Sequence, residues 1–353
     1  MLLAHTADLH LGSPLTARLS EDKRRIRRRE VDRALHTVVE DATARGAEGI
    51  LIVGDLFDSE HVLRRTVDGT LALIASYAPL PFFYVAGNHE GRTLSARGDL
   101  PDNLHVFGES FSTVTVGGVT VGGMSGGLSA KAIADIRMPA HTYNVLLLHT
   151  AVAERTDSEH LRPSDLSSGG VDYVALGHYH TYTVYPAGDR TVAVYAGAPE
   201  GRGFDECGER GYVLIDTDRR THALVPTAKR RVLDLDADLS EVSSAREAQR
   251  VIERVLSEAN ARPEDTVRVN ATGRTDADVR RDVGRLSALF EGRFFHFELR
   301  DRTRARLDTA AYTFDRSLKG EFVRLVMADS TLSEQEREAI IDCGLSHLQE
   351  SVR

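Results

Sequence analysis

Several features are scarce in this sequence of 353 residues. It has no tryptophan and only two cysteines, Cys207 and Cys343, which are too few for a disulfide framework or a thiolate metal site. No apolar run approaches the roughly 20 residues of a membrane span, because the longest runs, such as GILIVGDLF, have the length of a strand. The N-terminus lacks a basic stretch and reaches an acid at Asp8, so we expect no signal peptide, no membrane association and a cytoplasmic location.

The overall composition is that of a globular protein with an acidic balance. There are 53 acidic and 44 basic side chains, giving a formal charge of -9, and 41% of the residues are hydrophobic. Such fractions exclude wholesale disorder, and at about 150 residues per domain the length suggests two domains. Of the 14 histidines, 11 precede residue 181. Because imidazole is the commonest metal ligand, this half of the chain is where a metal site is expected.

The first 200 residues alternate strand-like and helix-like segments. Apolar runs predict strands at 2–6, 49–53 and 81–87, with helical stretches at about 20–45 and 64–77 between them. From about residue 103 the chain becomes mostly strand, with a glycine hairpin and predicted strands at 112–123, 144–148, 172–177, 191–197 and 211–216. This alternation predicts an α/β architecture in which two sheets pack together and helices flank them.

The pattern resets near residue 229. Helix, strand, helix and strand are predicted over 243–260, 266–273, 276–290 and 293–299, which would form a smaller α+β domain. Two helices are predicted in the tail, at about 315–328 and 333–350. The second has a capping-box signature in either of two registers, Thr331 with Glu334 or Ser333 with Glu336. We therefore expect domains at 1–228 and 229–310, followed by a helical segment at 311–353.

Polar motifs directly follow the predicted strands. They are Asp8-Leu9-His10, Gly54-Asp55-Leu56-Phe57-Asp58, Gly87-Asn88-His89-Glu90, His149 and Gly177-His178-Tyr179-His180. One such motif alone reads as a turn, but five in one half of the chain indicate a site at the strand ends. Without Glu90, the motifs offer three carboxylates, one amide and five imidazoles. An oxygen and nitrogen set without sulfur suits Mn, Fe or Zn in a site of two metals.

The motif series D-x-H, G-D-x-x-D, G-N-H-E, a lone histidine and G-H-x-H resembles the calcineurin-like metallophosphoesterases. Three longer stretches, LAHTADLHLGSPL, GDLFDSE and YAGAPEGRGFDECGERGYVLID, are similar to the SbcD/YhaO-type repair exonucleases. This resemblance implies a four-layer α/β/β/α sandwich with a smaller α+β cap domain that contacts DNA, and with C-terminal helices.

The resemblance also implies the roles of individual residues. One divalent ion, expected to be Mn²⁺, would be held by Asp8, His10 and His180. A second would be held by Asn88, His149 and His178, with Asp55 bridging the two. Two ions held by a bridging carboxylate can clamp a phosphoryl group and lower the pKa of a shared water.

His89 and Asp58 are the expected catalytic residues. His89 is left over from coordination, and its place beside Asn88 fits a general acid that protonates the leaving alkoxide. In many family members an acid at the position of Asp58 orients the catalytic histidine. The alternative for Asp58 is a helix N-cap for the following segment, and both readings stay open.

Basic residues offer candidate phosphate contacts. Arg202 lies in the glycine-containing loop GAPEGRGF, where the backbone can approach a phosphate closely. The alternative is an ordinary loop arginine that pairs with Asp205 or Glu206. The run Lys23–Arg29 and the cluster Lys229–Arg231 are either phosphate contacts or solvated helix faces.

Together these observations predict a metal-dependent DNA nuclease that acts in repair. The resemblance implies 3′–5′ exonuclease activity, allows endonuclease activity, and implies an SMC-like ABC-type ATPase as partner subunit and a homodimer. The C-terminal helices either dock on the coiled coil of that partner or only pack on each other. The alternatives are a phosphodiesterase of nucleotides or cyclic nucleotides and, in another class, a non-catalytic scaffold.

Overall fold

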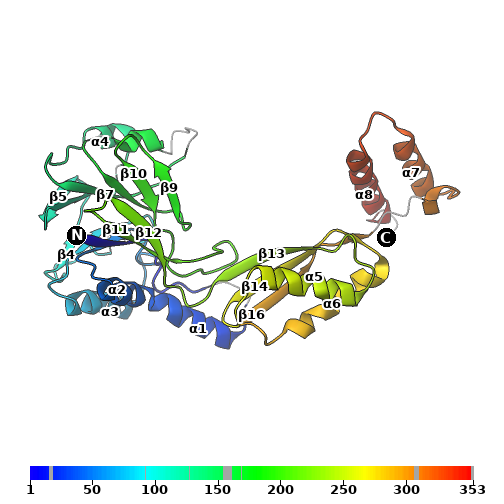
Figure 1. The fold of residues 1–353 in the computed structure, drawn as a ribbon, viewed down its shortest axis with the longest axis horizontal. Coiled ribbons are helices and arrows are strands. Elements are labelled where there is room, and N and C mark those ends of the chain that lie inside the picture. Colours follow the sequence, from blue (N-terminus) through cyan, green and yellow to red (C-terminus); the bar gives the residue numbers. More distant parts are fainter. Residues whose placement is uncertain are drawn as a thin grey trace. The chain divides into compact units, whose positions relative to one another are not determined.

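The computed structural model describes residues 1–15, 19–91, 93–126, 128–153, 161–167, 169–305 and 310–350. The chain divides into two compact units (Figure 1). Unit 1 consists of Met1–Asp234, Arg262–Val267 and Phe294–His296, and unit 2 of Leu235–Ala261, Arg268–Arg293 and Phe297–Arg353. Among the described residues no helix is both long and apolar enough to cross a membrane.

Unit 1 contains a six-stranded mixed sheet, called sheet 1, with the order β12-β11-β1-β2-β3-β4. The first four strands in the chain run parallel to one another. They are β1 (Leu2–Thr6), β2 (Ile50–Val53), β3 (Phe82–Val85) and β4 (Leu104–Val106). The chain returns to add β11 (Gly211–Asp216) antiparallel to β1, and then β12 (Thr221–Pro226).

A second mixed sheet, sheet 2, has the order β5-β6-β7-β8-β10-β9. Its strands are β5 (Ser112–Val116), β6 (Val119–Gly123), β7 (Tyr143–His149), β8 (Tyr173–Gly177), β9 (Thr183–Pro186) and β10 (Val192–Tyr195). The hairpin of β5 and β6 turns at Gly117 and Gly118, both with positive φ. From β6 to β10 the central strands are parallel, with β9 antiparallel at the edge.

Three hydrophobic cores hold unit 1 together, and strand β2 shows how one run serves two of them. Ile50 and Ile52 face a core shared with α2 (Ala34–Ala44) and α3 (Arg64–Ser76). Leu51 and Val53 alternate with them and face the core between the two sheets. The third core packs the outer face of sheet 2 against α4 (Ala130–Ala134) and the 3₁₀ turn η1 (Pro163–Ser167). The layers are therefore helices, sheet 1, sheet 2 and a thinner helical cover.

Unit 2 is built on a three-stranded sheet, β13-β14-β16, formed by Val232–Asp238, Thr266–Thr272 and His296–Asp301. Helices α5 (Ala245–Glu258) and α6 (Ala277–Phe290) pack on each other. Helix α5 buries Ala248, Ile252 and Leu256, which are four residues apart and share one face. A small bridge of β15 (Arg274–Thr275) with β17 (Arg304–Ala305) and the 3₁₀ turn η2 (Ala310–Tyr312) precede the tail.

The tail is a hairpin of two helices, α7 (Leu318–Ala328) and α8 (Glu334–Glu350). Of the two predicted capping registers, the one with Ser333 and Glu336 is observed. The hydroxyl of Ser333 donates to Glu336 Oε2 at 2.7 Å, and the backbone N–H of Glu336 lies 3.3 Å from that hydroxyl oxygen. Val323 and Ile341 are buried within the hairpin.

One predicted element differs from the structure. The helical stretch at 20–45 is two helices, α1 (Glu21–Asp32) and α2, separated at Arg33. Arg33 has φ -95° and ψ -2° and serves as the C-cap of one helix and the N-cap of the next. The sequence has no glycine or proline at this point, so nothing in it indicates the break.

Candidate metal centre

The ends of five strands bring the predicted ligands together. In sheet 1, Asp8 follows β1, Asp55 follows β2 and Asn88 follows β3. In sheet 2, His149 is the last residue of β7 and His178 follows β8. Because parallel strands end at the same edge of a sheet, the two sheets deliver polar side chains to one place.

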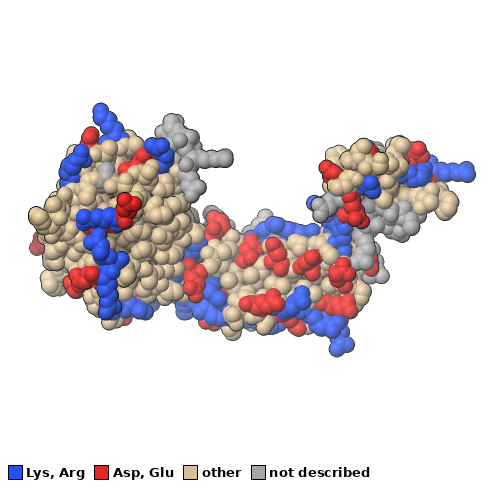
Figure 2. Space-filling model, turned by 45° about the horizontal axis from the view of Figure 1, so that its top comes forward, with Lys and Arg blue, Asp and Glu red and all other residues tan. Residues whose placement is uncertain are grey.

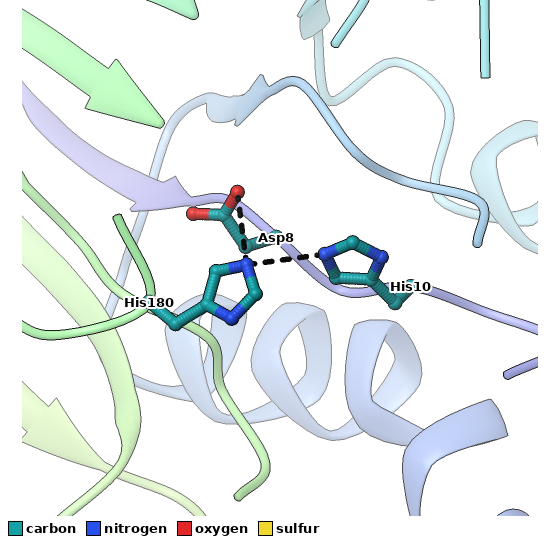
Figure 3. Close-up of side chains that lie close together, drawn as sticks. All are labelled: Asp8, His10 and His180. Atoms are coloured by element: carbon teal, nitrogen blue, oxygen red, sulfur yellow. Dashed lines mark hydrogen bonds and ion pairs between the residues drawn. The ribbon is translucent and has the colours of Figure 1, made fainter. Parts of the chain in front are cut away.

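Asp8, His10 and His180 form the first group, called half-site A. Nε2 of His10 lies 3.3 Å from Nε2 of His180, which in turn lies 4.0 Å from Oδ1 of Asp8 (Figure 3). One ligand atom from each residue lies within 4.8 Å of the other two. Asp8 and His10 are each 1% exposed. Two imidazole nitrogens and a carboxylate oxygen that converge in this way form a donor set for a divalent transition metal.

Asp55 lies between half-site A and a second group. Its Oδ2 is 3.8 Å from Nε2 of His10 and 3.4 Å from Nε2 of His149. Oδ1 of Asn88 lies 3.1 Å from Nε2 of His149 and 3.2 Å from Nδ1 of His178. We call Asn88, His149 and His178 half-site B. A carboxylate with one oxygen near both half-sites has the position that a bridging ligand needs.

The backbone at these residues is unusual. Asp8, His10, Asp55 and His178 have φ values of 52°, 47°, 48° and 106°. Residues other than glycine rarely adopt this left-handed backbone region, and each one that does so lowers the stability of the fold by on the order of 1 kcal/mol or more. The carboxylate of Asp8 accepts the backbone N–H of His178 at 3.0 Å, and Oδ1 of Asp55 accepts that of His89 at 3.0 Å. These bonds hold the strand-end loops in the strained conformation.

The pKa values of the two buried carboxylates of the site shift in opposite directions. Burial raises the pKa of Asp8, against the lowering effect of His149 and His180. Burial would also raise the pKa of Asp55, but the hydrogen bond and the charge of His149 lower it to about 2. Asp55 is therefore anionic at neutral pH although only 2% of it is exposed. A buried carboxylate among imidazole nitrogens is the environment that a bound cation stabilises.

The structure places the two predicted catalytic residues beside half-site A. His89 is half-exposed, with Nε2 4.0 Å from Oδ2 of Asp55 and Nδ1 3.2 Å from the backbone oxygen of Asp58. The carboxylate of Asp58 does not contact His89 in the contacts described; its Oδ1 lies 3.2 Å from Nδ1 of His10. The alternative role of Asp58 as a helix cap is not realised, because α3 begins at Arg64 with Leu63 at the N-cap.

Arg202 pairs with acids, as one of the two sequence interpretations expected. Its Nη2 lies 2.9 Å from Oε1 of Glu206, and its Nη1 lies 3.3 Å from Oδ1 of Asp58. Nη2 is also 3.1 Å from Nδ1 of His180. The arginine thus borders half-site A, with 19% of its side chain exposed. A phosphate contact by Arg202 stays a prediction.

Two buried acids of the site, Glu90 and Glu206, are not among the predicted ligands or catalytic residues. Glu90 is fully buried and accepts the backbone N–H groups of Phe57 at 2.7 Å and Gly87 at 3.1 Å, so it joins the loops that carry Asp55 and Asn88. Burial raises the pKa of Glu90, although those hydrogen bonds lower it. Oε1 of Glu206 lies 2.7 Å from Nδ1 of His180. The motif that contains Glu90 is a sequence signal for the first acid, whereas the sequence indicates Glu206 only as a possible partner of Arg202 and not of His180.

Comparison with known proteins agrees with this geometry. The family model of the calcineurin-like phosphoesterases matches residues 1–182, which include both half-sites and Asp55. The chain belongs to this family. The phosphoesterase has two mixed six-stranded sheets, which is consistent with the family's fold.

Individual relatives are similar at about one residue in four. The phosphoesterase is 25% identical over 299 residues to the DNA double-strand break repair protein Mre11 of Methanosarcina acetivorans, covering 78% of this chain and 46% of that protein. It is 24% identical over 338 residues to Mre11 of Archaeoglobus fulgidus, covering 85% and 74%. It is 26% identical over 244 residues to the uncharacterized metallophosphoesterase YhaO of Bacillus subtilis, covering 60% and 56%. The match thus spans about half of the first of these relatives.

Proposed function

We propose that this phosphoesterase is a metal-dependent nuclease that hydrolyses phosphodiester bonds of DNA. The observation that carries the proposal is Asp55, an anionic buried carboxylate with one oxygen within 4 Å of histidines from two half-sites. Such a centre takes two divalent ions, and Mn²⁺ fits a set of oxygen and nitrogen donors. Five similar proteins, from Methanosarcina acetivorans and four other species, are named DNA double-strand break repair proteins. These names favour DNA as the substrate.

The chain's own residues have separate tasks in this proposal. Asp8, His10 and His180 would hold one ion, Asn88, His149 and His178 would hold the other, and Asp55 would serve both. When bound, such ions neutralise the charge of a phosphodiester and activate water. His89 lies at the half-exposed rim of the centre, where its ring can donate a proton to the departing alkoxide oxygen. Its Nδ1 faces the backbone oxygen of Asp58, which fixes the ring.

Unit 2 is proposed as the cap that contacts DNA. Figure 2 shows Asp and Glu side chains interspersed with Lys and Arg over the part of unit 2 that it displays. A mixed surface of this kind suits contacts at single phosphates better than a continuous basic track. The dications would then supply much of the positive charge that a chain of net charge -9 needs near a polyanion.

The tail hairpin is proposed as the docking element for an SMC-like ATPase subunit. Although α7 and α8 bury Val323 and Ile341 between them, other apolar side chains stay in solvent. Their exposed fractions are 92% for Phe314, 71% for Leu318, 64% for Leu325, 42% for Met327 and 38% for Ile340. Exposed apolar residues on a helical hairpin suit a helix-in-groove contact with a partner.

The test is hydrolysis of an end-labelled linear DNA duplex by the purified full chain. It is run with Mn²⁺, with chelator, and beside a small chromogenic phosphodiester. We expect nucleotide release that requires Mn²⁺ and falls about 100-fold or more in His89→Asn, because a general acid contributes at least that factor. His141→Asn, an exposed histidine outside the centre, is the matched control and keeps full activity.

The other outcomes discriminate the alternatives. Hydrolysis of the chromogenic diester with intact DNA would replace the proposal by a phosphodiesterase of small substrates. Bound Mn²⁺ without hydrolysis of either substrate would favour a non-catalytic scaffold.

A further inference from the structure

In half-site A, a carboxylate lies near the Nδ1 atom of each histidine, on the side of the ring that faces away from the centre. His180 and His10 turn their Nε2 atoms toward each other at 3.3 Å and their Nδ1 atoms away from the centre. Nδ1 of His180 lies 2.7 Å from Oε1 of Glu206, and Nδ1 of His10 lies 3.2 Å from Oδ1 of Asp58. The hydrogen bond to Glu206 keeps the proton of His180 on Nδ1 and leaves its Nε2 unprotonated, as a metal ligand must be. The contact of Asp58 with His10 is an ion-pair distance without hydrogen-bond geometry.

A single arginine connects the two carboxylates. Both Nε and Nη2 of Arg202 contact Oε1 of Glu206, at 3.1 and 2.9 Å, while Nη1 reaches Oδ1 of Asp58 at 3.3 Å. The backbone N–H of Arg202 also donates to the second oxygen of Glu206 at 2.7 Å. Glu206 is only 3% exposed, so this arrangement is fixed by packing as well as by charge.

The distances decide which group controls the tautomer of His180. Nη2 of Arg202 lies 3.1 Å from Nδ1 of His180, so the arginine would donate to this atom if it carried no proton. The carboxylate oxygen of Glu206 is closer, at 2.7 Å, and accepts only. With Glu206 in place His180 donates from Nδ1; without it, Arg202 would favour the other tautomer and turn a proton toward the metal position.

Half-site B is held differently. Nδ1 of His149 lies 3.0 Å from the backbone oxygen of Val53, which no side-chain substitution removes. The two half-sites therefore depend on different supports. A change at Glu206 or Arg202 reaches His180 of half-site A directly, whereas it reaches half-site B through the backbone between His178 and His180 and through Asp8 and Asp55.

We infer that Glu206 and Arg202, with Asp58 as a further partner of the arginine, form a positioning layer that sets the metal affinity of half-site A more strongly than that of half-site B. This inference rests on the metal centre of the proposed function and gives Arg202 a role besides the predicted phosphate contact. The layer keeps His180 in the tautomer and orientation that ligation requires, and places the carboxylate of Asp58 within ion-pair distance of His10.

The experiment is a Mn²⁺ titration of the metal-free full chain, with free Mn²⁺ followed by electron paramagnetic resonance. Wild-type protein is expected to bind two ions. Glu206→Gln keeps the size of the side chain but removes its charge, and we expect one of the two affinities to fall by 10–100-fold. Glu209→Gln, the same change at an exposed position of the same loop, is the control and binds both ions as the wild type does.

A second variant protects the test against loss of folding. Arg202→Gln leaves Glu206 in place and is expected to weaken the same ion less. In the double variant the two losses are expected to be less than additive, because both changes act on one histidine. Circular dichroism confirms that each variant is folded before it is titrated.

The outcomes separate the inference from the proposed function. If Glu206→Gln and Arg202→Gln bind two ions as tightly as the wild type, the inference is wrong and the dinuclear centre stands. An equal loss in Glu209→Gln would also overturn it, because general loop damage would then explain the effect. If the wild type binds no metal, the proposed centre itself fails and the inference fails with it.

Discussion

At the scale of single residues, Asp55 and His89 are neighbours with different expected tasks. Asp55→Asn removes the negative charge between the half-sites, so we expect loss of at least one bound Mn²⁺ per chain. His89→Asn is expected to keep both ions, because each half-site has three other predicted ligands besides Asp55. Metal content after gel filtration, measured by atomic emission, checks both expectations.

The contrary result has a clear geometric basis. His10, Asp55 and His89 also have ligand atoms within 4.8 Å of one another. If His89→Asn lost as much metal as Asp55→Asn, His89 would be a ligand and another group would have to protonate the alkoxide.

His5 gives the fold a sensitivity to acid. It is fully buried, with Nδ1 3.1 Å from the hydroxyl of Tyr173 and Nε2 3.2 Å from the carbonyl oxygen of Leu176. The neutral ring satisfies both partners, and burial lowers its pKa from 6.5 to about 3, against the raising effect of the Leu176 bond. In the unfolded chain His5 takes up a proton below pH 6.5, whereas in the folded chain it does not.

Stability is therefore expected to fall as the pH drops from 6.5 toward 3. At pH 5 we expect His5 to have lowered the free energy of unfolding by about 2 kcal/mol relative to neutral pH, since each pH unit below 6.5 costs about 1.4 kcal/mol. His5→Gln is expected to be less stable at pH 7.5 but to lose less on acidification. Urea unfolding of both proteins at pH 7.5 and pH 5 measures the difference, and equal losses would contradict a neutral buried His5.

At the scale of elements, one arginine of the basic run of α1 and one of the cluster Lys229–Arg231 are buried and have a structural role. Arg27 is buried and contacts Glu30 and Glu200, the latter at 3.0 Å. Nη2 of Arg230 lies 2.6 Å from Oε1 of Glu30, and its guanidinium lies 3.7 Å from the centre of the Phe295 ring. These contacts join helix α1 to the segment that leads into β13 and explain why so many charges occur there.

Replacing Arg230 tests this joint. Arg230→Gln leaves the mostly buried Glu30 with Arg27 as its remaining partner among these contacts, so we expect a loss of roughly 3 kcal/mol in the free energy of unfolding. Arg219→Gln is the control, because that arginine is exposed and its pair with Asp216 at 3.6 Å contributes little. Denaturant midpoints provide the measurement, and a loss no larger than that of Arg219→Gln would contradict the proposed joint.

The sequence predicts elements whose signal is local and misses those defined by distant contacts. The runs ILIV and FFYV are apolar because each strand is buried on both faces, so β2 and β3 could be predicted. Strands β4, β9 and β12 lie at sheet edges and are short or partly exposed. Their pairing partners, rather than their composition, define them. The break at Arg33 likewise has no local signal, because neither glycine nor proline stands there.

The same distinction holds within the site. The predicted ligand residues follow strands in short motifs, and the strand order brings them together, so the sequence could indicate which residues the fold assembles. The contact of Glu206 with His180 could not be predicted from the sequence, because it joins two loops 26 residues apart. The partner of Asp58 also differed from expectation, since its carboxylate lies on His10 and only its backbone oxygen faces His89.

At the scale of the whole molecule, every residue of the candidate centre belongs to unit 1. Bound metal stabilises only the state that contains its ligands in place, and at a concentration 100 times the dissociation constant this amounts to about 2.7 kcal/mol. We expect Mn²⁺ to slow hydrogen exchange in peptides that end β1, β2, β3, β7 and β8. Peptides from α5, α6, α7 and α8 should keep their exchange rates.

Mass spectrometry of exchanged and digested protein gives this comparison peptide by peptide. Asp55→Asn is the control and should show the smaller response in unit 1. Equal protection of both units by Mn²⁺ would contradict a centre confined to unit 1.

The left-handed backbone of Asp8, His10, Asp55 and His178 has a consequence for protein engineering. Glycine or asparagine tolerates this conformation better than histidine does, so such replacements would relieve strain in the metal-free chain. A library selected only for thermal stability without metal would accordingly enrich glycine and asparagine at positions 10 and 178. Directed evolution of this scaffold therefore has to select for metal retention together with stability, because selection for stability alone erodes the centre.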